Sequence, residues 1–427
     1  MKLQLQRHHI QPAMKEACFI IDRLLNAGFS AFFVGGAVRD TLLRRPLHDI
    51  DIATNALPEQ VMALFPNCIP TGLKHGTVTV VEEGASYEIT TFRTESNYTD
   101  YRRPADITFV NDLYDDLMRR DFTMNAMAID RNWQLHDPFD GLAHVKAGIL
   151  KTVGSSEQRF QEDALRMLRA IRFAATYKLT IDQDCWNAMV SEASLLKHIA
   201  MERIAYEIER LMQGSDPLYG VKLLIESTLL QHTKDKLHLA EGLLQDEVQL
   251  PYDRDSIMNW AMLFYSLQLS SENAREDMRA LRTSKQLQIA CEHLLQLQEW
   301  LKNTALEQVS TNVNKLDVNL KEQWMDKLLQ YPDKHLTLFM RTFYREYKVI
   351  EHIEKLHQSL PVHRIKQLAV RGDDLMKWRG KASGPWINLL LEQIFIEVAS
   401  CRLDNSKETI YSYVINKAEG GRYNEQS

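Results

Sequence analysis

The pattern of hydrophobic and polar residues changes character near residue 150. Before that point alternating patterns of period two are mixed with helical spacing, and after it almost every segment is helical in period. The first part predicts short strands in AFFVGG, DIDIAT, HGTVTVVEEG and SYEITTFR, and helices in PAMKEACFIIDRLLNAG and LPEQVMALFP. We therefore expect an α+β or α/β domain over residues 1–150, followed by helices.

The helical part opens with GSSEQRFQEDALRMLRAIRFAATY, where apolar residues recur at helical spacing and Ser155 with Gln158 is spaced as a capping box. Further helices are expected in MERIAYEIERLMQG, SIMNWAMLFYSLQL, NAREDMRALRTSKQLQIACEHLLQLQEWL and KEQWMDKLLQY. No repeat of fixed period is visible, so a solenoid is not predicted. Interruptions rich in Gly/Ser and Asn/Thr suggest domains over residues 1–150, 151–215, 216–315 and 316–427.

Composition fits a folded protein of several domains. The chain has 427 residues, of which 45% are hydrophobic and 25% charged. The net charge of -6 argues against a globally basic nucleic-acid binder, although local patches decide binding. Five scattered cysteines without a C-x-x-C pair favour reduced thiols in the cytoplasm over disulfides or zinc. No secretory signal is expected, and the apolar stretch from Trp386 contains Glu392 and Glu397, which favours a core helix over a membrane span.

Two carboxylates stand out at Asp49 and Asp51. On a strand, residues two apart point to the same face, so these side chains repel each other unless a cation lies between them. Oxygen ligands shared with substrate phosphates suit Mg²⁺. A D-x-D pair in a solvent-exposed turn is the plain alternative, because the pattern alone is common.

The segment VGGAVRD, just before these aspartates, predicts a strand, a glycine turn and a helix start. Gly35 and Gly36 would let backbone N–H groups approach an anion, and Arg39 adds positive charge. A tight turn explains a lone Gly-Gly pair equally well. Neither a P-loop nor a complete G-x-G-x-x-G motif is present, so neither a P-loop ATPase nor a Rossmann dehydrogenase is predicted.

Two further clusters carry charge. In LMRRDFTMNAMAID, Arg119 and Arg120 are suited to phosphate oxygens or to orienting a ribose through Asp121, and a surface ion pair is as good an explanation. In EDALRMLRAIR, four charged residues at successive i+3 steps predict a polar ridge on a helix, for which surface ion pairs are the plain alternative. These residues are Asp163, Arg166, Arg169 and Arg172.

The region from Arg341 to Lys381 is basic, with ten Lys or Arg against five Asp or Glu. Aromatic residues at 343, 344, 347 and 378 are interleaved with these charges. A basic segment with aromatics suits phosphate contact and base stacking in RNA. A solvated helix face with core aromatics is slightly favoured on this evidence alone.

Together the clusters resemble class II tRNA nucleotidyltransferases, the CCA-adding enzymes, and their relatives the bacterial poly(A) polymerases. The matching segments occur in the family's order over the first half of the chain: GGAVRD with DIDIAT, RRDFTMNA, DPFDG, EDALRMLRAIRF and ERIAYEIERLM. The resemblance implies a polymerase-β-like head followed by an all-α neck, body and tail in a seahorse-like shape. It also implies tRNA as partner, CTP and ATP as substrates, and Mg²⁺ as cofactor, with no membrane and no obligatory protein partner.

The resemblance also implies roles for individual residues. Asp49 and Asp51 match the metal-binding carboxylates, with Glu88 as a candidate third; two Mg²⁺ ions would activate the RNA 3′-hydroxyl and stabilise departing pyrophosphate. Nucleotide-binding positions of the family match Gly36, Arg39, Arg120, Asp163, Arg166, Arg169 and Arg172. Of these, Asp163 and Arg166 match the base-selecting pair. A carboxylate beside a guanidinium complements the donor and acceptor edge of cytosine and of adenine, and mismatches the reversed order in uracil and guanine.

Several alternatives stay open within this resemblance. A poly(A) polymerase is expected to carry a GRRF-like segment where TGLKHGTVTVV stands, and enzymes limited to CC addition lack the long charged loop expected in TESNYTDYRRPADITFVNDLYDD. Full CCA addition is therefore favoured, whereas an A-adding enzyme is harder to exclude. A catalytically inactive tRNA-binding homologue is disfavoured because the metal-binding carboxylates are intact.

Overall fold

The computed structural model describes residues 4–6, 10–47, 49–82, 84–99, 103–244, 255–303, 323–345 and 349–420, without the side chains of 96–99, 103–106 and 417–420. The chain forms two compact units, each considered by itself. The N-terminal unit comprises Met1–Tyr252 with Ala280–Thr283, and the C-terminal unit comprises Asp253–Arg279 with Ser284–Ser427.

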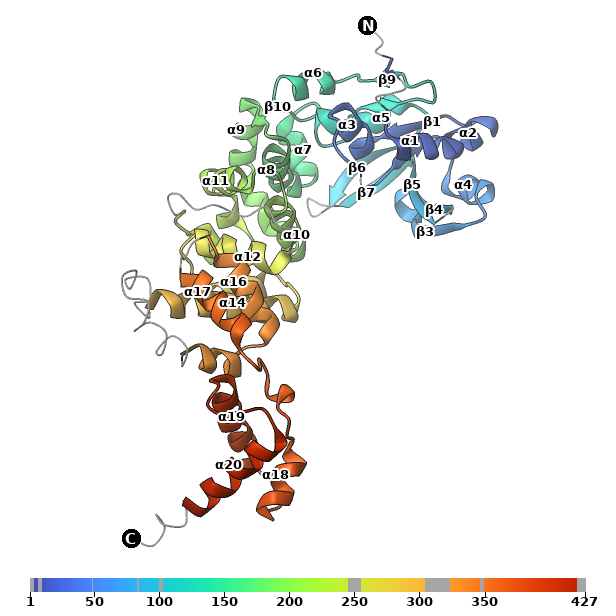
Figure 1. The fold of residues 1–427 in the computed structure, drawn as a ribbon. Helices are drawn as coiled ribbons and strands as arrows, with labels where there is room; N and C mark the ends of the chain where they lie inside the picture. The colour runs from blue at the N-terminus through green and yellow to red at the C-terminus, as the bar shows by residue number, and fades with distance from the viewer. Residues whose placement is uncertain are drawn as a thin grey trace. The chain divides into compact units, whose positions relative to one another are not determined.

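A mixed seven-stranded sheet is the centre of the N-terminal unit (Figure 1). Strand β2 (Asp51–Thr54) pairs in parallel with β5 (Ala85–Thr91) and antiparallel with β1 (Ala31–Val34), so the sheet is mixed. In spatial order the strands are β3 (Cys68–Gly72), β4 (Thr77–Glu82), β5 (Ala85–Thr91), β2 (Asp51–Thr54), β1 (Ala31–Val34), β8 (Ala128–Ile129) and β9 (Leu135–His136). The expected fold class is confirmed.

Each face of this sheet buries its own apolar cluster. One face packs Phe33, Ile52 and Ile89 against helices α1 (Pro12–Glu16), α2 (Cys18–Asn26) and α4 (Pro58–Leu64). The other face packs Val34 and Ala53 against α5 (Leu113–Met118). Alternate strand residues therefore enter different cores, as the period of two predicts.

Two elements near the sheet differ from expectation. The first predicted helix is divided into α1 and α2 at Ala17, although it ends as expected at Gly28, whose φ of 87° is left-handed. The segment expected to be a long loop instead forms an antiparallel hairpin of β6 (Arg93–Thr99) and β7 (Arg103–Phe109), followed by α5. That expectation was wrong because β-branched and aromatic residues outweigh the charges there.

Helices follow the sheet within the N-terminal unit (Figure 1). They are α6 (Gly141–Lys146), α7 (Ser156–Glu162), α8 (Leu165–Tyr177), α9 (Gln183–Ser191), α10 (Met201–Met212) and α11 (Pro217–Ser227), with a short parallel pair of β10 (Ile149–Leu150) and β11 (Thr180–Ile181). The Ser155 side chain caps α7 by accepting from the N–H of Gln158, which confirms that N-terminus. The helix break at Asp163 was not anticipated.

The described part of the C-terminal unit is helical. Its helices are α12 (Ser256–Ser266), α13 (Ser271–Ala280), α14 (Lys285–Asn303), α16 (Asp333–Phe343), α17 (Val349–Ser359), α18 (Gly372–Arg379), α19 (Trp386–Ala399) and α20 (Lys407–Gly420), with helical turns also over 323–330. One long predicted helix is thus two, α13 and α14, separated at Arg282, whose φ is 58°.

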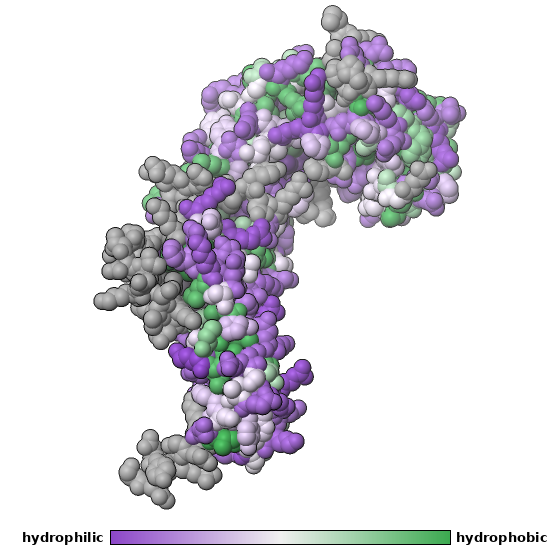
Figure 2. Space-filling model, viewed as in Figure 1, coloured by the Kyte–Doolittle hydropathy of each residue, from purple (hydrophilic) through white to green (hydrophobic). Residues whose placement is uncertain are grey.

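Helix α19 buries Ile394 and Phe395, whereas Leu389 on the same helix is 61% exposed. Hydrophilic side chains cover most of the described surface seen in Figure 2, with hydrophobic patches between them. No helix among the described residues is both long and apolar enough to span a membrane.

Candidate active site

The carboxylate of Asp51 lies at the first residue of β2, between two strands. Its register partners are Val34 on β1 and Glu88 on β5, so Asp51 and Glu88 are neighbours on the same sheet face. Burial raises the pKa of Asp51; Arg120 and Arg39 lower it, whereas Glu88 and Asp49 raise it further. The net shift of the pKa is upward, so the positive charges of Arg120 and Arg39 do not fully compensate for burial and for the neighbouring acids.

Asp49 takes a different position from the one expected. It precedes β2 and is exposed, so it is not a strand residue and the expectation of a shared strand face was wrong for it. Its charge still reaches Asp51, because it contributes to the raised pKa of that group. The strand itself starts only at Asp51, where pairing with β1 and β5 begins.

These acidic residues suit a divalent cation by their donor chemistry. The Asp51 carboxylate makes no hydrogen bond or ion pair with the described residues, and two further carboxylates raise its pKa. Within the described part of the chain, however, no three metal-ligating side chains converge on one point. The donor set therefore fits an ion held jointly by protein carboxylates and substrate oxygens, as Mg²⁺ often is.

The N-terminus of helix α3 (Gly35–Leu42) faces the same carboxylate. Gly35 has a φ of 64°, and a Cβ there would lie 3.2 Å from Asp51 Oδ2 and 3.1 Å from Arg120 Nη1. At Gly36, a Cβ would lie 3.5 Å from Arg39 Nη2. The two glycines thus let the backbone approach the charged groups, with Gly35 the more tightly constrained of the pair.

Arg39 is 8% exposed and contacts several other side chains. Its guanidinium donates to both carboxylate oxygens of Asp40 and, at 2.6 Å, to Oδ1 of Asn125. It also lies over the ring of Tyr177, 4.5 Å from the centroid, and the Tyr177 hydroxyl donates to Asp40 at 2.9 Å. Three of its five N–H groups are used, which leaves two for an anion.

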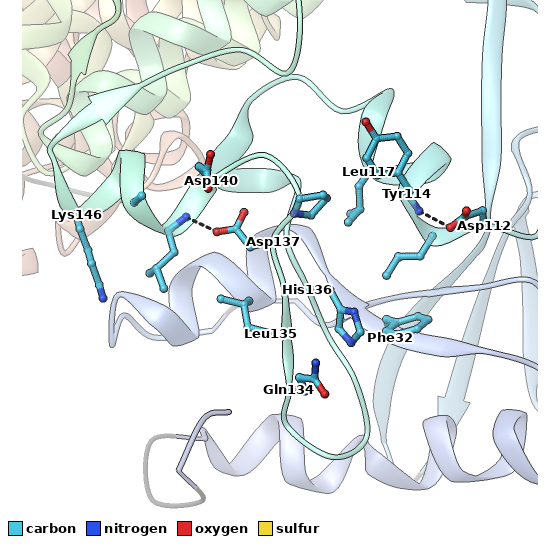
Figure 3. Close-up of a pocket in the computed structure, with 14 residues that line it drawn as sticks. Phe32, Asp112, Tyr114, Leu117, Gln134, Leu135, His136, Asp137, Asp140 and Lys146 are labelled. Atoms are coloured by element: carbon cyan, nitrogen blue, oxygen red, sulfur yellow. Dashed lines mark hydrogen bonds between the residues drawn. The ribbon is translucent and has the colours of Figure 1, made fainter. Parts of the chain in front are cut away.

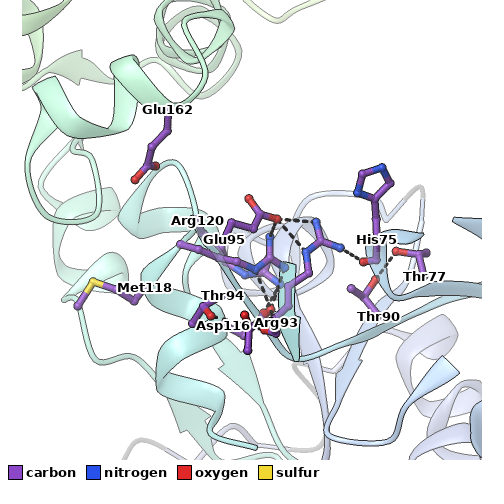
Figure 4. A network of polar contacts seen from close by, with 12 residues as sticks. His75, Thr77, Thr90, Arg93, Thr94, Glu95, Asp116, Met118, Arg120 and Glu162 are labelled. Carbon is purple, nitrogen blue, oxygen red and sulfur yellow. Dashed lines mark hydrogen bonds and ion pairs between the residues drawn. The ribbon is translucent and has the colours of Figure 1, made fainter. Parts of the chain in front are cut away.

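Asp116, on α5, is fully buried and organises the arginines around it (Figure 4). Arg119 donates to its Oδ1 at 2.8 Å and Arg120 to its Oδ2 at 3.2 Å. Burial raises the pKa of Asp116, but the two arginines outweigh this and the net pKa is lowered. Arg119 also bonds Glu95, which in turn pairs with Arg93 at the start of the hairpin. These interactions are part-buried and centre on a fully buried carboxylate, so the surface ion-pair alternative does not apply to Arg119 or Arg120.

Asp121, in the segment between α5 and residue 123, is also buried and bonds to helix α8. Arg169 donates to Asp121 Oδ2 through Nε at 2.9 Å and through Nη2 at 2.5 Å. One turn further on, Arg172 donates to Glu207 of α10 at 2.6 Å. The arginines of α8 therefore reach across to other elements and do not form pairs along their own helix.

The pair expected to select the base is close in sequence but separately engaged. Asp163 is extended, with φ -141°, and its Oδ1 accepts from the N–H of Leu165, which starts α8. Both of its oxygens also accept from Arg203 of α10, at 3.3 and 2.9 Å. Arg166, 8% exposed, donates to Glu162 at 2.6 Å. The expectation that Asp163 lies on the same helix as Arg166 was wrong, because its side chain caps that helix.

The DPFDG segment has a structural explanation. Both oxygens of Asp137 accept N–H bonds at the start of α6, from Gly141 at 2.7 Å and from Leu142 at 2.9 Å. A Cβ on Gly141 would lie 2.2 Å from the carbonyl oxygen of Thr123, so only glycine fits there. The segment therefore packs α6 against the turn that follows RRDFT.

A cavity of about 780 Å³ lies beside that segment (Figure 3), lined by Phe32, Tyr114, His136 and Lys146 among others. None of the residues predicted to bind metal or nucleotide lines it. The charged groups predicted for the site lie around Asp51 and not in this cavity.

Residues important to the site were missed by sequence reasoning. Glu162, Asn125, Arg203 and Glu207 all bond predicted site residues, and each stands inside a motif that was already visible. Their position within those motifs was the only signal that they belong to the site. Sequence reasoning could not pair them with their partners, which lie up to 86 positions away in the chain.

Comparison with known proteins matches three family models along the chain. The Poly A polymerase head domain matches residues 31–151, a probable RNA- and SrmB-binding site of polymerase A matches 178–238, and tRNA nucleotidyltransferase domain 2 (putative) matches 254–414. The mixed sheet with its acidic residues, together with these matches, defines the chain as a nucleotidyltransferase.

Full-length relatives narrow the assignment. The chain is 40% identical to the CCA-adding enzyme of Geobacillus sp. (strain WCH70), covering 94% of this chain and 97% of the relative, and 37% identical to that of Geobacillus stearothermophilus, covering 96% and 98%. The crystal structure of the Bacillus stearothermophilus CCA-adding enzyme in complex with CTP matches with a TM-score of 0.80 at 35% identity, covering 97% of this chain and all of that one. The chain belongs to the family of CCA-adding enzymes.

Proposed function

We propose that the chain adds C, C and A to the 3′ end of tRNA without a template, using CTP and ATP and releasing pyrophosphate. The observation that carries this proposal is the Asp51 carboxylate, whose pKa is raised by burial and by two neighbouring acids, beside the N-terminus of α3 and Arg120. Such a cluster favours a cation and a triphosphate together. Membership of the CCA-adding family supports the choice of tRNA and of CTP and ATP.

Asp49 and Asp51 would hold Mg²⁺, with Glu88 beside them on β5. When bound, the ion neutralises charge at the attacking and leaving oxygens. The glycines at the start of α3 let the backbone approach the triphosphate, and the free N–H groups of Arg39 and Arg120 bind its oxygens. The RNA 3′-hydroxyl then forms a bond to the α-phosphorus as the α–β phosphoanhydride bond breaks, without any covalent bond to the protein.

Base selection is assigned to Asp163 and Arg166. A carboxylate has about four lone-pair sites, and three are used by Arg203 and Leu165, so Asp163 retains capacity for an exocyclic amine. Arg166 uses Nη1 for Glu162 and for the Arg159 carbonyl, and Nη2 for the Arg119 carbonyl, which leaves its Nε–H and one Nη2–H for a ring nitrogen. Arg169 and Arg172 would add nucleotide contacts from the same helix.

The tRNA body would contact the C-terminal unit. Its basic region contains Tyr344, which is 49% exposed, whereas Phe343 is buried in the helical core, so only part of the interleaved aromatic set is available for stacking. Tyr347 lies outside the described residues. We place the reaction in the cytoplasm, where tRNA is processed and where the five free thiols would stay reduced.

The proposal is tested by incubating the protein with Mg²⁺, CTP, ATP and tRNA transcripts that end before each of the three CCA nucleotides, and sequencing the 3′ ends. We expect all three transcripts to end in CCA. Addition of A to CC-ended tRNA alone would identify an A-adding enzyme, and long A tracts a poly(A) polymerase. Binding of tRNA without any extension would identify an inactive homologue and refute the proposal.

A further inference from the structure

Asn125 lies where several predicted nucleotide-binding residues meet. It ends a short 3-10 turn, η3 (Thr123–Asn125), and is 7% exposed. Its Oδ1 accepts from Arg39 at 2.6 Å, and its Nδ2 donates to Asp121 at 2.9 Å. Its backbone carbonyl accepts from Arg120 at 3.3 Å. One residue thus contacts both arginines that are assigned to the triphosphate.

The chemistry of the neighbours defines the orientation of the Asn125 amide. A guanidinium only donates and an ionised carboxylate only accepts, so the oxygen must face Arg39 and the amide nitrogen must face Asp121. Asp121 is ionised: burial raises its pKa, but Arg169 and the hydrogen bonds from Asn125 and Arg169 hold the pKa well below the ordinary range. Asparagine supplies one acceptor and one donor at this spacing, and aspartate does not.

Contacts that begin at Asn125 reach α8 by two routes. Through Arg39 they pass to Asp40, which accepts from the Tyr177 hydroxyl near the end of α8. Through Asp121 they pass to Arg169 in the middle of the same helix. Helix α3, which would face the triphosphate, is therefore connected by buried and part-buried hydrogen bonds to the helix that Asp163 caps.

We propose that Asn125 is a positioning residue of the nucleotide site, whose amide aligns Arg39 for the triphosphate while it holds Asp121 against Arg169. The inference rests on the proposed function for the roles of Arg39 and Arg120. We place Asn125 behind Arg39 and not against the substrate, because it is 7% exposed and its amide oxygen and nitrogen each contact a protein group. Its loss would weaken the binding of CTP and ATP alike, because both carry the same triphosphate.

The decisive variant is Asn125→Asp, which keeps the shape and removes the donor. At about pH 8 the introduced carboxylate faces that of Asp121, whereas its protonation at lower pH restores one donor and one acceptor. Charged or titratable groups surround position 125 on several elements. Helix α3 contributes Arg39 and Asp40, and the segment of Asn125 itself contributes Arg120 and Asp121. Helix α8 contributes Arg169, and Tyr177 by way of Asp40, while His144 of α6 bonds Thr123. The wild-type pH profile, measured in parallel, accounts for their own titration.

We would titrate the full-length protein with CTP by calorimetry and measure kcat/KM for CTP and ATP at about pH 8 and pH 6. A lost hydrogen bond to a charged group corresponds to a loss of about tenfold in affinity. For Asn125→Asp we expect that loss at the higher pH and recovery of several-fold, relative to wild type, at the lower one. Asn55→Asp is the matched control, because the Asn55 side chain accepts from the Ser30 N–H at 2.8 Å and donates to no group among the described residues, so a carboxylate keeps its bond.

Two results would overturn the inference: CTP affinity of Asn125→Asp within about twofold of wild type, or an equal loss at both pH values. If this variant does not fold, Asn125→Ser removes the amide without adding charge, and unchanged CTP affinity in it would overturn the inference as well. The proposed function is judged separately, by tRNA extension with the wild-type chain. Calorimetry decides the role of Asn125 whether or not extension is observed.

Discussion

Replacing Gly35 by alanine tests whether the start of α3 must approach Asp51 and Arg120 closely. Its φ of 64° costs an L-residue about 1–2 kcal/mol, which lowers the free energy of unfolding. The new Cβ would also lie 3.1 Å from Arg120 Nη1 and 3.2 Å from Asp51 Oδ2, so these groups must shift by a few tenths of an ångström. Because a misplacement of about 1 Å can cost about a hundredfold in rate, we expect kcat/KM to fall roughly tenfold.

Gly148→Ala separates the effect of backbone strain from the effect of the close contacts at position 35. Gly148 has a φ of 71°, close to that of Gly35, and a Cβ there would meet nothing within 4 Å. Both variants should lose similar thermal stability, measured by melting curves, while only Gly35→Ala loses activity, measured as single-nucleotide addition to a CC-ended tRNA. Equal activity of the two variants would refute the close-approach argument, because backbone strain alone would then account for everything.

Three further predictions concern charged groups. The folded-state pKa of Asp51 is raised, so its ionisation destabilises the fold as pH rises from about 4 through that raised pKa, and the effect is constant above it. Without Mg²⁺, the melting temperature of Asp51→Asn should therefore rise relative to wild type over that window and stay higher above it. Added Mg²⁺ should stabilise only wild type, and an unchanging difference in melting temperature across the window would contradict this. Asp163→Ala should incorporate UTP and GTP more readily relative to CTP and ATP, and unaltered selectivity in extension assays would remove its proposed role. Arg203→Met should reproduce this loss of selectivity, since Arg203 holds both oxygens of Asp163; wild-type selectivity in that variant would show that the cap alone positions Asp163.

Much of the fold was predictable because its signals are local. Alternating apolar residues predict β1, β2, β4 and β5, of which β1 and β2 place residues in both cores, and helical spacing predicts most helices. The breaks were not predictable in this way. Asp163 interrupts one helix because its side chain accepts from Leu165 and pairs with Arg203, 40 positions away. Periodicity continues through such a break, since the apolar positions stay in phase.

The same distinction, between what local sequence predicts and what distant contacts decide, applies to the candidate site. The residue types at Asp49, Asp51, Gly36 and Arg39 could be named from their motifs, because a glycine turn followed by paired acids is a feature of nearby residues. The tertiary structure decided which groups meet: it pairs Asp51 with Glu88 across β2 and β5 and leaves Asp49 outside the strand. It also joins Arg39 to Asp121 through Asn125, across 86 positions. Local composition determines the kinds of side chain present, whereas contacts between distant segments depend on how the chain packs, which no local pattern encodes.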